Sequence, residues 1–207
     1  MYIPGPFKVT DSGTIRGFIN DNGFGMLITS VNGKIWATHV PMLLAKDNDQ
    51  SEILTGHLSK ANIQWKEFEK SQEVLVVFPG NHSYISSSWY DHENVPTWNY
   101  LAVHVYGTIR IIEGDELKDE LTKMVNKYES GMPNPVSVER MTERFVQREM
   151  KGIVGFKISI SEIQAAQKLS QNRDDKNYLR IINGLENKGD PDSLQMAKIM
   201  KQKKQIK

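Results

Sequence analysis

The 207-residue sequence contains no cysteine, and this absence removes a whole group of chemistries at once. Disulfides, iron–sulfur clusters, zinc–thiolate sites and thiol nucleophiles are all excluded. An excess of one charge is also missing, since 26 basic and 25 acidic residues leave a formal net charge of +1. A chain with so little net charge has no global field that would concentrate nucleic acid or an anionic membrane.

Long hydrophobic runs are absent too, and no apolar segment approaches the length that a membrane-spanning helix needs. The first residues, MYIPGPF, lack the basic start and apolar core of a signal peptide. We therefore expect a cytoplasmic protein with no membrane partner. The composition, 39% hydrophobic and 25% charged, is that of an ordinary globular domain.

The signature motifs of common enzymes are lacking as well. No dinucleotide fingerprint or phosphate-cradling glycine loop occurs, and the run Ser86, Ser87, Ser88 has no glycine elbow around it. The five histidines show none of the i,i+3 or i,i+4 pairing that helical metal sites use. Each is expected to be a core residue or, as a second choice, a ligand contact. We expect no metal, and the residues alone identify no catalytic group.

What the chain does have is an aromatic run between Pro79 and Arg110, which reads as two strands joined by a loop. In the second strand, two kinds of side chain alternate with the two-residue period that is typical of a β-strand. One face carries Trp98, Tyr100, Ala102, His104 and Tyr106, and the other carries Asn99, Leu101, Val103 and Val105. The aliphatic face can fill a core. The ring-bearing face suits a ligand wall, or it simply seals a barrel or a dimer.

Short strands separated by turns and helices extend along the rest of the chain. The predicted elements are a helix around Ile15–Ile19 capped by Asp11 or Ser12, a hairpin turning at Asn32-Gly33, a strand over Glu52–Ser59, a short helix over Asn62–Glu69, a strand over Val74–Phe78 stopped by Pro79-Gly80, helices over Asp115–Tyr128 and Val138–Met150, and a strand over Gly152–Ile160. This order predicts a mostly β (α+β) fold, a barrel of about six antiparallel strands with flanking helices. We expect a barrel domain with inserted helices over residues 1–161, and a segment over 162–207 that ends in a helical, Lys-rich and frayed tail.

Two basic motifs are candidate anion sites. In GHLSKANIQW a predicted strand ends at Ser59-Lys60 and a helix begins near Asn62, so a hydroxyl, an ammonium and free backbone N–H groups could meet one phosphate. The alternative is an ordinary helix cap by Asn62 with a solvated Lys60. In KLSQNR, Lys168 and Arg173 could help Lys60 to neutralise a phosphate, or the segment could be a solvent-facing loop that caps the helix after Asp174.

Several longer motifs, in order, resemble the PaiB family of FMN-binding negative transcriptional regulators. They are MYIP with Phe7, THVPMLL, GHLSKAN with Gln64-Trp65, VVFPGNHSYISSSWY, VPTWNYLAVHVYG, GIVGFKI and KLSQNR. The resemblance covers nearly the whole chain. The sequence departs from it at Ile63, where the family usually has proline, and at Gln167, where it usually has tryptophan.

The resemblance implies a homodimeric split β-barrel that binds FMN at the subunit interface. Carried over by position, Thr38, His39 and Val40 lie along the flavin ring, and Ser59 and Lys60 hold the phosphate. Trp98 and Tyr100 lie near the ring, from the same or the second subunit, and Lys168, Gln171 and Arg173 close the pocket. The 162–207 segment thereby becomes part of the flavin site. A hydrogen bond from His39 to the ring would make that residue the best candidate for acid–base work.

Three functions stay open at this stage. The first is an FMN-binding repressor that acts on genes directly or indirectly, although the only basic cluster, Lys198–Lys207, would bind DNA without sequence preference. The second is a flavin-dependent oxidoreductase with a nicotinamide or other redox partner. The third is a module that binds heme or pyridoxal phosphate in the same cleft, since related barrels do so.

Overall fold

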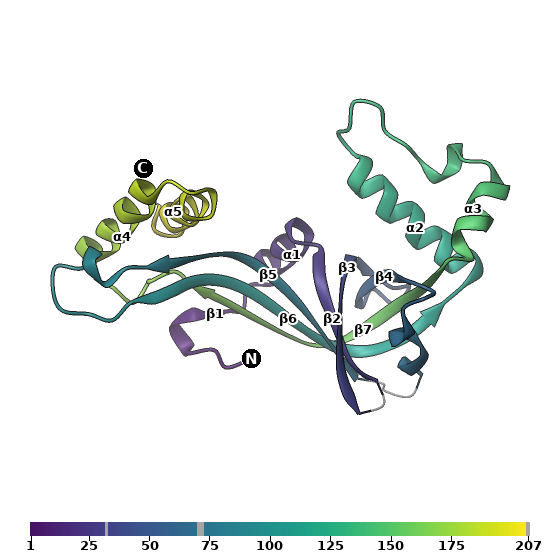
Figure 1. Ribbon diagram of the computed structural model, residues 1–207, viewed down its shortest axis with the longest axis horizontal. Helices are drawn as coiled ribbons and strands as arrows, with labels where there is room; N and C mark the ends of the chain where they lie inside the picture. Colours follow the sequence, from purple (N-terminus) through teal and green to yellow (C-terminus); the bar gives the residue numbers. More distant parts are fainter. Residues whose placement is uncertain (32, 70–72, 206–207) are drawn as a thin grey trace. The chain divides into compact units, whose positions relative to one another are not determined.

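The computed structural model describes residues 1–31, 33–69 and 73–205. Two compact units follow from the contacts within the chain. The barrel unit consists of Ile19–Phe78 and His104–Ile163, and the terminal unit consists of Met1–Phe18, Pro79–Val103 and Gln164–Lys207. Three long strands continue from one unit into the other along the chain (Figure 1). Among the described residues, no helix is both long and apolar enough to cross a membrane.

The sheet is antiparallel, and its strands are β1 (Lys8–Val9), β2 (Phe24–Val31), β3 (Lys34–Lys46), β4 (Glu52–Ser59), β5 (Glu73–Ile85), β6 (Thr97–Ile112) and β7 (Ile153–Lys168). Their order is β1-β7-β4-β3-β2-β5-β6, and an additional pairing joins β7 to β6. That pairing closes β2 to β7 into a six-stranded ring, while β1 is a short addition to β7. The predicted α+β fold with a barrel of about six antiparallel strands is therefore confirmed.

The predicted hairpin joins β2 to β3, with Val31 opposite Lys34 in the register. Gly33 has φ +79°, the left-handed conformation that a tight hairpin turn requires and that glycine adopts without strain. The other half of the predicted turn, Asn32, lies outside the described residues. From this turn the register runs without interruption to Phe24 opposite Pro41.

The aromatic strand β6 alternates as predicted. Asn99, Leu101, Val103 and Val105 are buried, whereas the ring-bearing residues between them are exposed or half-buried. Further along β6 lies Gly107, where a Cβ atom would lie 2.3 Å from the carbonyl oxygen of Ser159 on β7. Only glycine allows these two backbones to approach so closely, and this contact accompanies the closing of the ring.

The core of the barrel unit consists of aliphatic and aromatic side chains from every ring strand. Its fully buried members include Leu27, Met42, Leu54, Phe68, Val76, Phe78, Val105, Phe156 and Ile158. The rings of Phe68 and Phe156 meet edge to face, 5.9 Å apart. Phe68 follows the 3-10 helix η2 (Ile63–Glu67), which replaces the longer helix predicted over Asn62–Glu69.

The helices of the barrel unit are α2 (Gly114–Glu129), the 3-10 turn η4 (Val138–Arg140) and α3 (Glu143–Met150). Helix α2 matches the helix predicted over Asp115–Tyr128 to within one residue at each end. The single helix predicted over Val138–Met150 is wrong, because Met141 is extended and Thr142 starts a new helix by accepting a hydrogen bond from the amide of Phe145. A Ser or Thr cap of this kind is a signal that the sequence contains.

The terminal unit contains the 3-10 turns η1 (Gly5–Phe7) and η3 (Ser87–Trp89) and the helices α4 (Asp175–Lys188) and α5 (Pro191–Lys204). It also contains the helix α1 (Ser12–Asp21) as far as Phe18. Asp11 caps α1 by accepting from the amide of Thr14, as predicted. The helices α4 and α5 pack against each other (Figure 1). Their shared core includes Ile85, Tyr90, Leu101, Leu169, Tyr178, Ile181, Ile182, Leu185, Met196, Ala197 and Met200.

The expected fraying of the Lys-rich tail is wrong as far as Lys204. Helix α5 runs to that residue, starts at Pro191 behind an Asp190 cap, and buries Met196 and Met200. Lys204 pairs with Asp175 at 2.7 Å. The last two residues of the tail, 206 and 207, lie outside the described residues.

Two strand ends also differ from their predictions. Pro79-Gly80 does not stop β5, which continues to Ile85. The register of β5 with β2 covers only Leu75 to Val77, so Pro79 comes after the part of β5 that needs an amide donor on that side. The strand predicted over Gly152–Ile160 is correspondingly longer, and β7 runs to Lys168.

Candidate functional site

A buried glutamine organises the part of the barrel unit that contains Thr38. Gln64, fully buried, donates from Nε2 to the carbonyl of Leu27 (3.1 Å) and to Oγ1 of Thr29 (3.0 Å). Its Oε1 accepts from the Thr38 hydroxyl at 2.6 Å, and Nδ2 of Asn62 donates to that hydroxyl at 2.9 Å. The only donor of the Thr38 side chain is therefore used inside the protein. Neither Gln64 nor Asn62 was predicted as a site residue.

The next residues of β3 form a free strand edge. The amide of Met42 donates to the carbonyl of Gly23 at 2.8 Å, so Met42 faces the β2 side of the strand. Backbone groups alternate in antiparallel strands, so the amide and carbonyl of His39 face the opposite side. The register with β4 starts only at Met42 and Gly56, so in the described strands nothing pairs with His39 there. Val40 is buried in the core.

The His39 ring lies on the exposed side of this edge. It stacks on Phe24, with ring centroids 6.0 Å apart and an interplanar angle of 25°. Both residues are exposed, and Phe24 retains 61% of its accessible surface. A flat aromatic surface therefore lies beside a backbone donor and acceptor, which is the combination that a planar heterocycle with a polar edge needs.

Ser59 and Lys60 are placed at the end of β4 as predicted, but their amides are not free. The Lys60 amide donates to the carbonyl of Gly152 at 2.8 Å, and the Asn62 amide donates to the carbonyl of Ser59 at 2.9 Å. The Ala61 amide donates to the Ser59 hydroxyl at 3.3 Å. The expected cradle of unpaired N–H groups is therefore wrong, because the Gly152 carbonyl and the turn into η2 accept from these amides.

The Lys60 side chain, in contrast, is available to a ligand. It is exposed and lines a cavity of about 270 Å³ together with Trp65, Lys151 and the apolar side chains of Leu117 and Met150. Trp65 is fixed there by a hydrogen bond from Nε1 to the Lys60 carbonyl at 3.0 Å. Two ammonium groups beside an apolar wall can hold the charged end of an amphipathic anion.

The other predicted residues belong to the terminal unit. Trp98 is exposed on the ring-bearing face of β6, where His82 and Tyr84 contact it at centroid distances of 5.9 and 5.8 Å. Tyr100 is half-buried on the same face. The aromatic run thus forms an open platform of rings within this unit.

In the KLSQNR motif, one predicted contact is already used by the protein. Gln171 accepts from the Leu169 amide through Oε1 and donates through Nε2 to the carbonyls of Pro6 and Gln167. Its polar side-chain atoms thus close the turn after β7. Lys168 donates from Nζ to Oγ1 of Thr97 at 2.6 Å.

Arg173 lies over the ring of Tyr90, with 5.2 Å between the guanidinium carbon and the ring centroid. Tyr90 is 5% exposed, and its hydroxyl has no hydrogen-bond partner in the part of the chain that the structure describes. A buried hydroxyl without a partner is uncommon. The Tyr90 hydroxyl and the Arg173 guanidinium could therefore both stabilise an additional polar group.

The residues of the barrel unit fit FMN on these grounds. The cofactor combines a flat ring system that has a polar edge with a phosphate dianion, and the barrel unit offers a free backbone edge at His39 and an available cation at Lys60. The predicted residues fall into two sets, with Thr38, His39, Val40, Ser59 and Lys60 in the barrel unit and Trp98, Tyr100, Lys168, Gln171 and Arg173 in the terminal unit.

Comparisons with known proteins identify the same cofactor. The family model described as "Putative FMN-binding domain" matches residues 1–162. The chain is 50% identical over 208 residues to "Protease synthase and sporulation protein PAI 2" of Bacillus subtilis, with 100% of both chains covered. The family model thus confirms the prediction of an FMN-binding domain, and the relative confirms the predicted PaiB family.

Solved structures support the fold alone, since their sequence identities are low. The FAD and heme binding protein from Mycobacterium smegmatis has a TM-score of 0.63 at 12% identity, covering 83% of this chain and 78% of that one. The flavocytochrome Anf3 from Azotobacter vinelandii has a TM-score of 0.58 at 17% identity, covering 84% and 75%. The chain belongs to the FMN-binding domain family that the family model defines, and within it to the PaiB proteins that its motifs predicted.

Proposed function

We propose that this protein binds FMN, with the ring along β3 at Thr38, His39 and Val40 and the phosphate at Ser59 and Lys60. The observation that carries the proposal is the unpaired backbone edge at His39 in the same unit as the available ammonium of Lys60. Bound FMN would supply electron-transfer chemistry. The protein's residues would orient the ring and neutralise the phosphate. Because the Thr38 hydroxyl is used by Gln64, Thr38 would act through its position on the strand.

Absorption and affinity test this proposal. The purified protein should show flavin absorption or bind added FMN, and Lys60→Ala should weaken FMN binding by roughly 1.5–3 kcal/mol, the scale of a charge-assisted hydrogen bond. Riboflavin lacks the phosphate, so its affinity should not change. Lys66→Ala removes another exposed cation, from η2, and serves as the control. A colourless protein that stays empty in excess FMN would end the proposal, and a Soret band would favour heme.

The residues of the terminal unit need separate variants. Trp98→Ala removes the centre of the aromatic platform, and Arg173→Ala removes the cation beside the unpartnered Tyr90 hydroxyl. Each should weaken FMN binding if the sequence-based prediction is correct. Gln171→Ala should act mainly on stability, because its side chain is occupied within the turn.

We also propose that the protein is a homodimer. The outer face of the barrel unit is apolar, with Phe24 and Ile35 retaining 61% and 77% of their surface. Ile28, Leu75 and Tyr106 belong to the same face and help to line a hollow of about 280 Å³. An exposed apolar patch of this kind is typical of a protein interface. Light scattering on the purified protein tests the proposal, and a monomer at every concentration would contradict it.

His104 gives the dimer proposal an independent observation. It shares the ring-bearing side of β6 with Tyr106, its Nδ1 is buried without a partner in the described parts of the chain, and burial lowers its pKa. A second subunit covering this face could supply the missing hydrogen bond. Such a contact would be isologous, as in most homodimers.

The physiological role that fits best is regulation by an indirect route. The PAI 2 relative is named for protease synthesis and sporulation. In this chain two of the four lysines of α5 pair internally, Lys201 with Glu186 at 2.6 Å and Lys204 with Asp175 at 2.7 Å. Lysine contacts to DNA phosphates carry no sequence preference, so this helix offers no basis for recognising a specific DNA site. In a mobility-shift assay at physiological salt, sequence-dependent retardation of DNA would overturn the indirect route. Bleaching of bound FMN by NADH or NADPH under anaerobic conditions would instead favour the reductase alternative. We propose a cytoplasmic location for either role.

A further inference from the structure

A second cavity of the barrel unit shares no lining residue with the cavity beside Lys60. It has a volume of about 490 Å³ and lies among the turn after β3, the strands β6 and β7, and the helix α2. Charged side chains dominate its lining, four basic and four acidic. What such a cavity can bind depends on which of these charged side chains already pair with one another.

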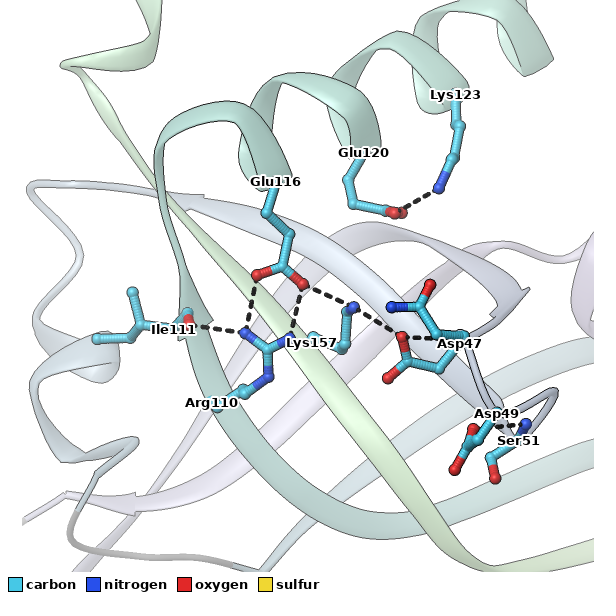
Figure 2. Close-up of polar contacts among 10 residues, drawn as sticks. Asp47, Asp49, Ser51, Arg110, Ile111, Glu116, Glu120, Lys123 and Lys157 are labelled. Atoms are coloured by element: carbon cyan, nitrogen blue, oxygen red, sulfur yellow. Dashed lines mark hydrogen bonds and ion pairs between the residues drawn. The ribbon is translucent and has the colours of Figure 1, made fainter.

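One wall of the cavity is internally satisfied (Figure 2). Lys157 is 6% exposed, and its Nζ lies 2.7 Å from Oε1 of Glu116 and 3.3 Å from Oδ1 of Asp47. Arg110 makes a bidentate contact with Glu116 at 2.6 and 2.9 Å. Two cations and two carboxylates therefore neutralise one another. Because Lys157 is buried, leaving its ammonium without carboxylate partners would be costly, and these contacts hold the wall in place.

The α2 side of the cavity is not satisfied. Glu120 is 8% exposed, one turn after Glu116 and on the same face of the helix, and Figure 2 shows both carboxylates directed toward the strands. Lys123 pairs with Oε1 of Glu120 at 2.7 Å. Oε2 is buried and has no hydrogen-bond partner within the described residues. A buried carboxylate oxygen without a donor is unfavourable, so the cavity presents a place that a donor would stabilise.

Lys123 already occupies Oε1 of Glu120, and a second carboxylate in the lining would attract a cationic donor to Oε2. Asp119, also part of the lining, is exposed and adds a second acceptor beside Glu120. No group of three or more His, Cys, Asp or Glu side chains in the described chain could hold a metal ion. A cavity of this volume is also much larger than a single ion needs. We propose that the cavity binds a small organic cation through a primary ammonium group, with Glu120 Oε2 as the buried acceptor.

Titration calorimetry on the full chain tests this proposal. The probes are 1,4-diaminobutane and alanine, which carry the ammonium group as an amine and as an amino acid, with acetate and Mg²⁺ as comparisons. At least one ammonium probe should bind, and acetate should not. Binding of the diamine alone identifies an amine site, and binding of alanine alone identifies an amino-acid site that also uses the lining lysines.

Variants assign the binding to Glu120. Glu120→Gln keeps the shape and removes the charge, so the affinity of the ammonium probe should fall roughly 10- to 100-fold, the value of a hydrogen bond to a charged group. The milder Asp119→Asn, at an exposed position, should weaken binding less. Asp115→Asn removes a carboxylate from the same helix outside the cavity and should have no effect. Binding of neither ammonium probe, binding of Mg²⁺ alone, or equal affinity in Glu120→Gln would overturn the proposal.

Discussion

At the scale of single residues, one buried glutamine side chain connects the core of the barrel unit to the part of β3 that is proposed to bind the flavin. Gln64 links β2, β3 and η2 through its side chain, and it holds the Thr38 hydroxyl in one orientation. The Ile63 position, where the family usually has proline, does not disturb this arrangement. Asn62 caps η2 by accepting from the Gln64 amide at 3.0 Å, so the helix start is secured by a side chain.

Gln64→Ala should therefore lower the free energy of unfolding by about 2–4 kcal/mol, because it removes the donor to the buried Thr29 hydroxyl and the acceptor of the half-buried Thr38 hydroxyl. Urea unfolding measures the change. Gln147→Ala, an exposed glutamine on α3, should stay within about 0.5 kcal/mol of the wild type. Equal stability of the two variants would show that the network is dispensable.

The residue scale also shows what the sequence could and could not predict about the site. Ser59 and Lys60 lie at the end of β4 as expected, because a strand followed by Asn and a helix is a local pattern. The hydrogen bond from the Lys60 amide to the Gly152 carbonyl could not be predicted, since that partner is far away along the chain. Gln64 was missed for the same reason: its partners on β2 and β3 are defined only by the folded register.

At the scale of elements, an ion-pair group fastens α2 to β6 and β7. Hydrogen bonds from Arg110 and then Lys157 lower the pKa of Glu116 to about 2 from its ordinary 4.5. Because the pKa is lower in the folded state, the stabilisation from ionised Glu116 is complete above about pH 4.5 and is lost as the pH falls toward 2.

The stability difference between the wild type and Glu116→Gln should therefore shrink as the pH is lowered from 6 to 2.5. Thermal unfolding across that range measures it. Glu93→Gln, at an exposed position in the loop before β6, should reproduce the wild-type profile. A constant difference between wild type and Glu116→Gln at every pH would contradict the assignment of this acid sensitivity to Glu116.

The packing of α4 provides a second prediction for an element. A Cβ atom on Gly184 would lie 2.4 Å from the Trp89 ring, so Gly184→Ala should destabilise the protein by about 1–3 kcal/mol through overpacking. Gly17 on α1 has no atom within 4 Å of its Cβ position. Gly17→Ala should therefore stabilise the protein by about 0.5–1 kcal/mol, the ordinary helix preference of alanine. Chemical denaturation of both variants should show opposite signs.

The elements that were predicted well are those whose boundaries are local. β4 has the predicted bounds because polar turns flank an apolar run, and α2 differs by a residue because its apolar spacing is regular. Pro79 misled the prediction for β5, since whether a proline ends a strand depends on the neighbouring strand. The prediction that the tail frays was wrong because it relied on the many lysines. Met196 and Met200 become core residues only through their packing against α4.

At the scale of the whole molecule, the proposed dimer makes stability depend on concentration. A protein that is stabilised by association unfolds at a higher temperature when its concentration rises. The wild-type Tm should therefore increase with protein concentration, and Ile35→Lys should remove that dependence by placing a charge in the apolar face. Val95→Lys is the matched control, because Val95 is similarly exposed, at 71% against 77%, and belongs to the terminal unit. If both variants behave alike, or if the wild-type Tm is independent of concentration, the outer face of β2 and β3 is not the dimer contact.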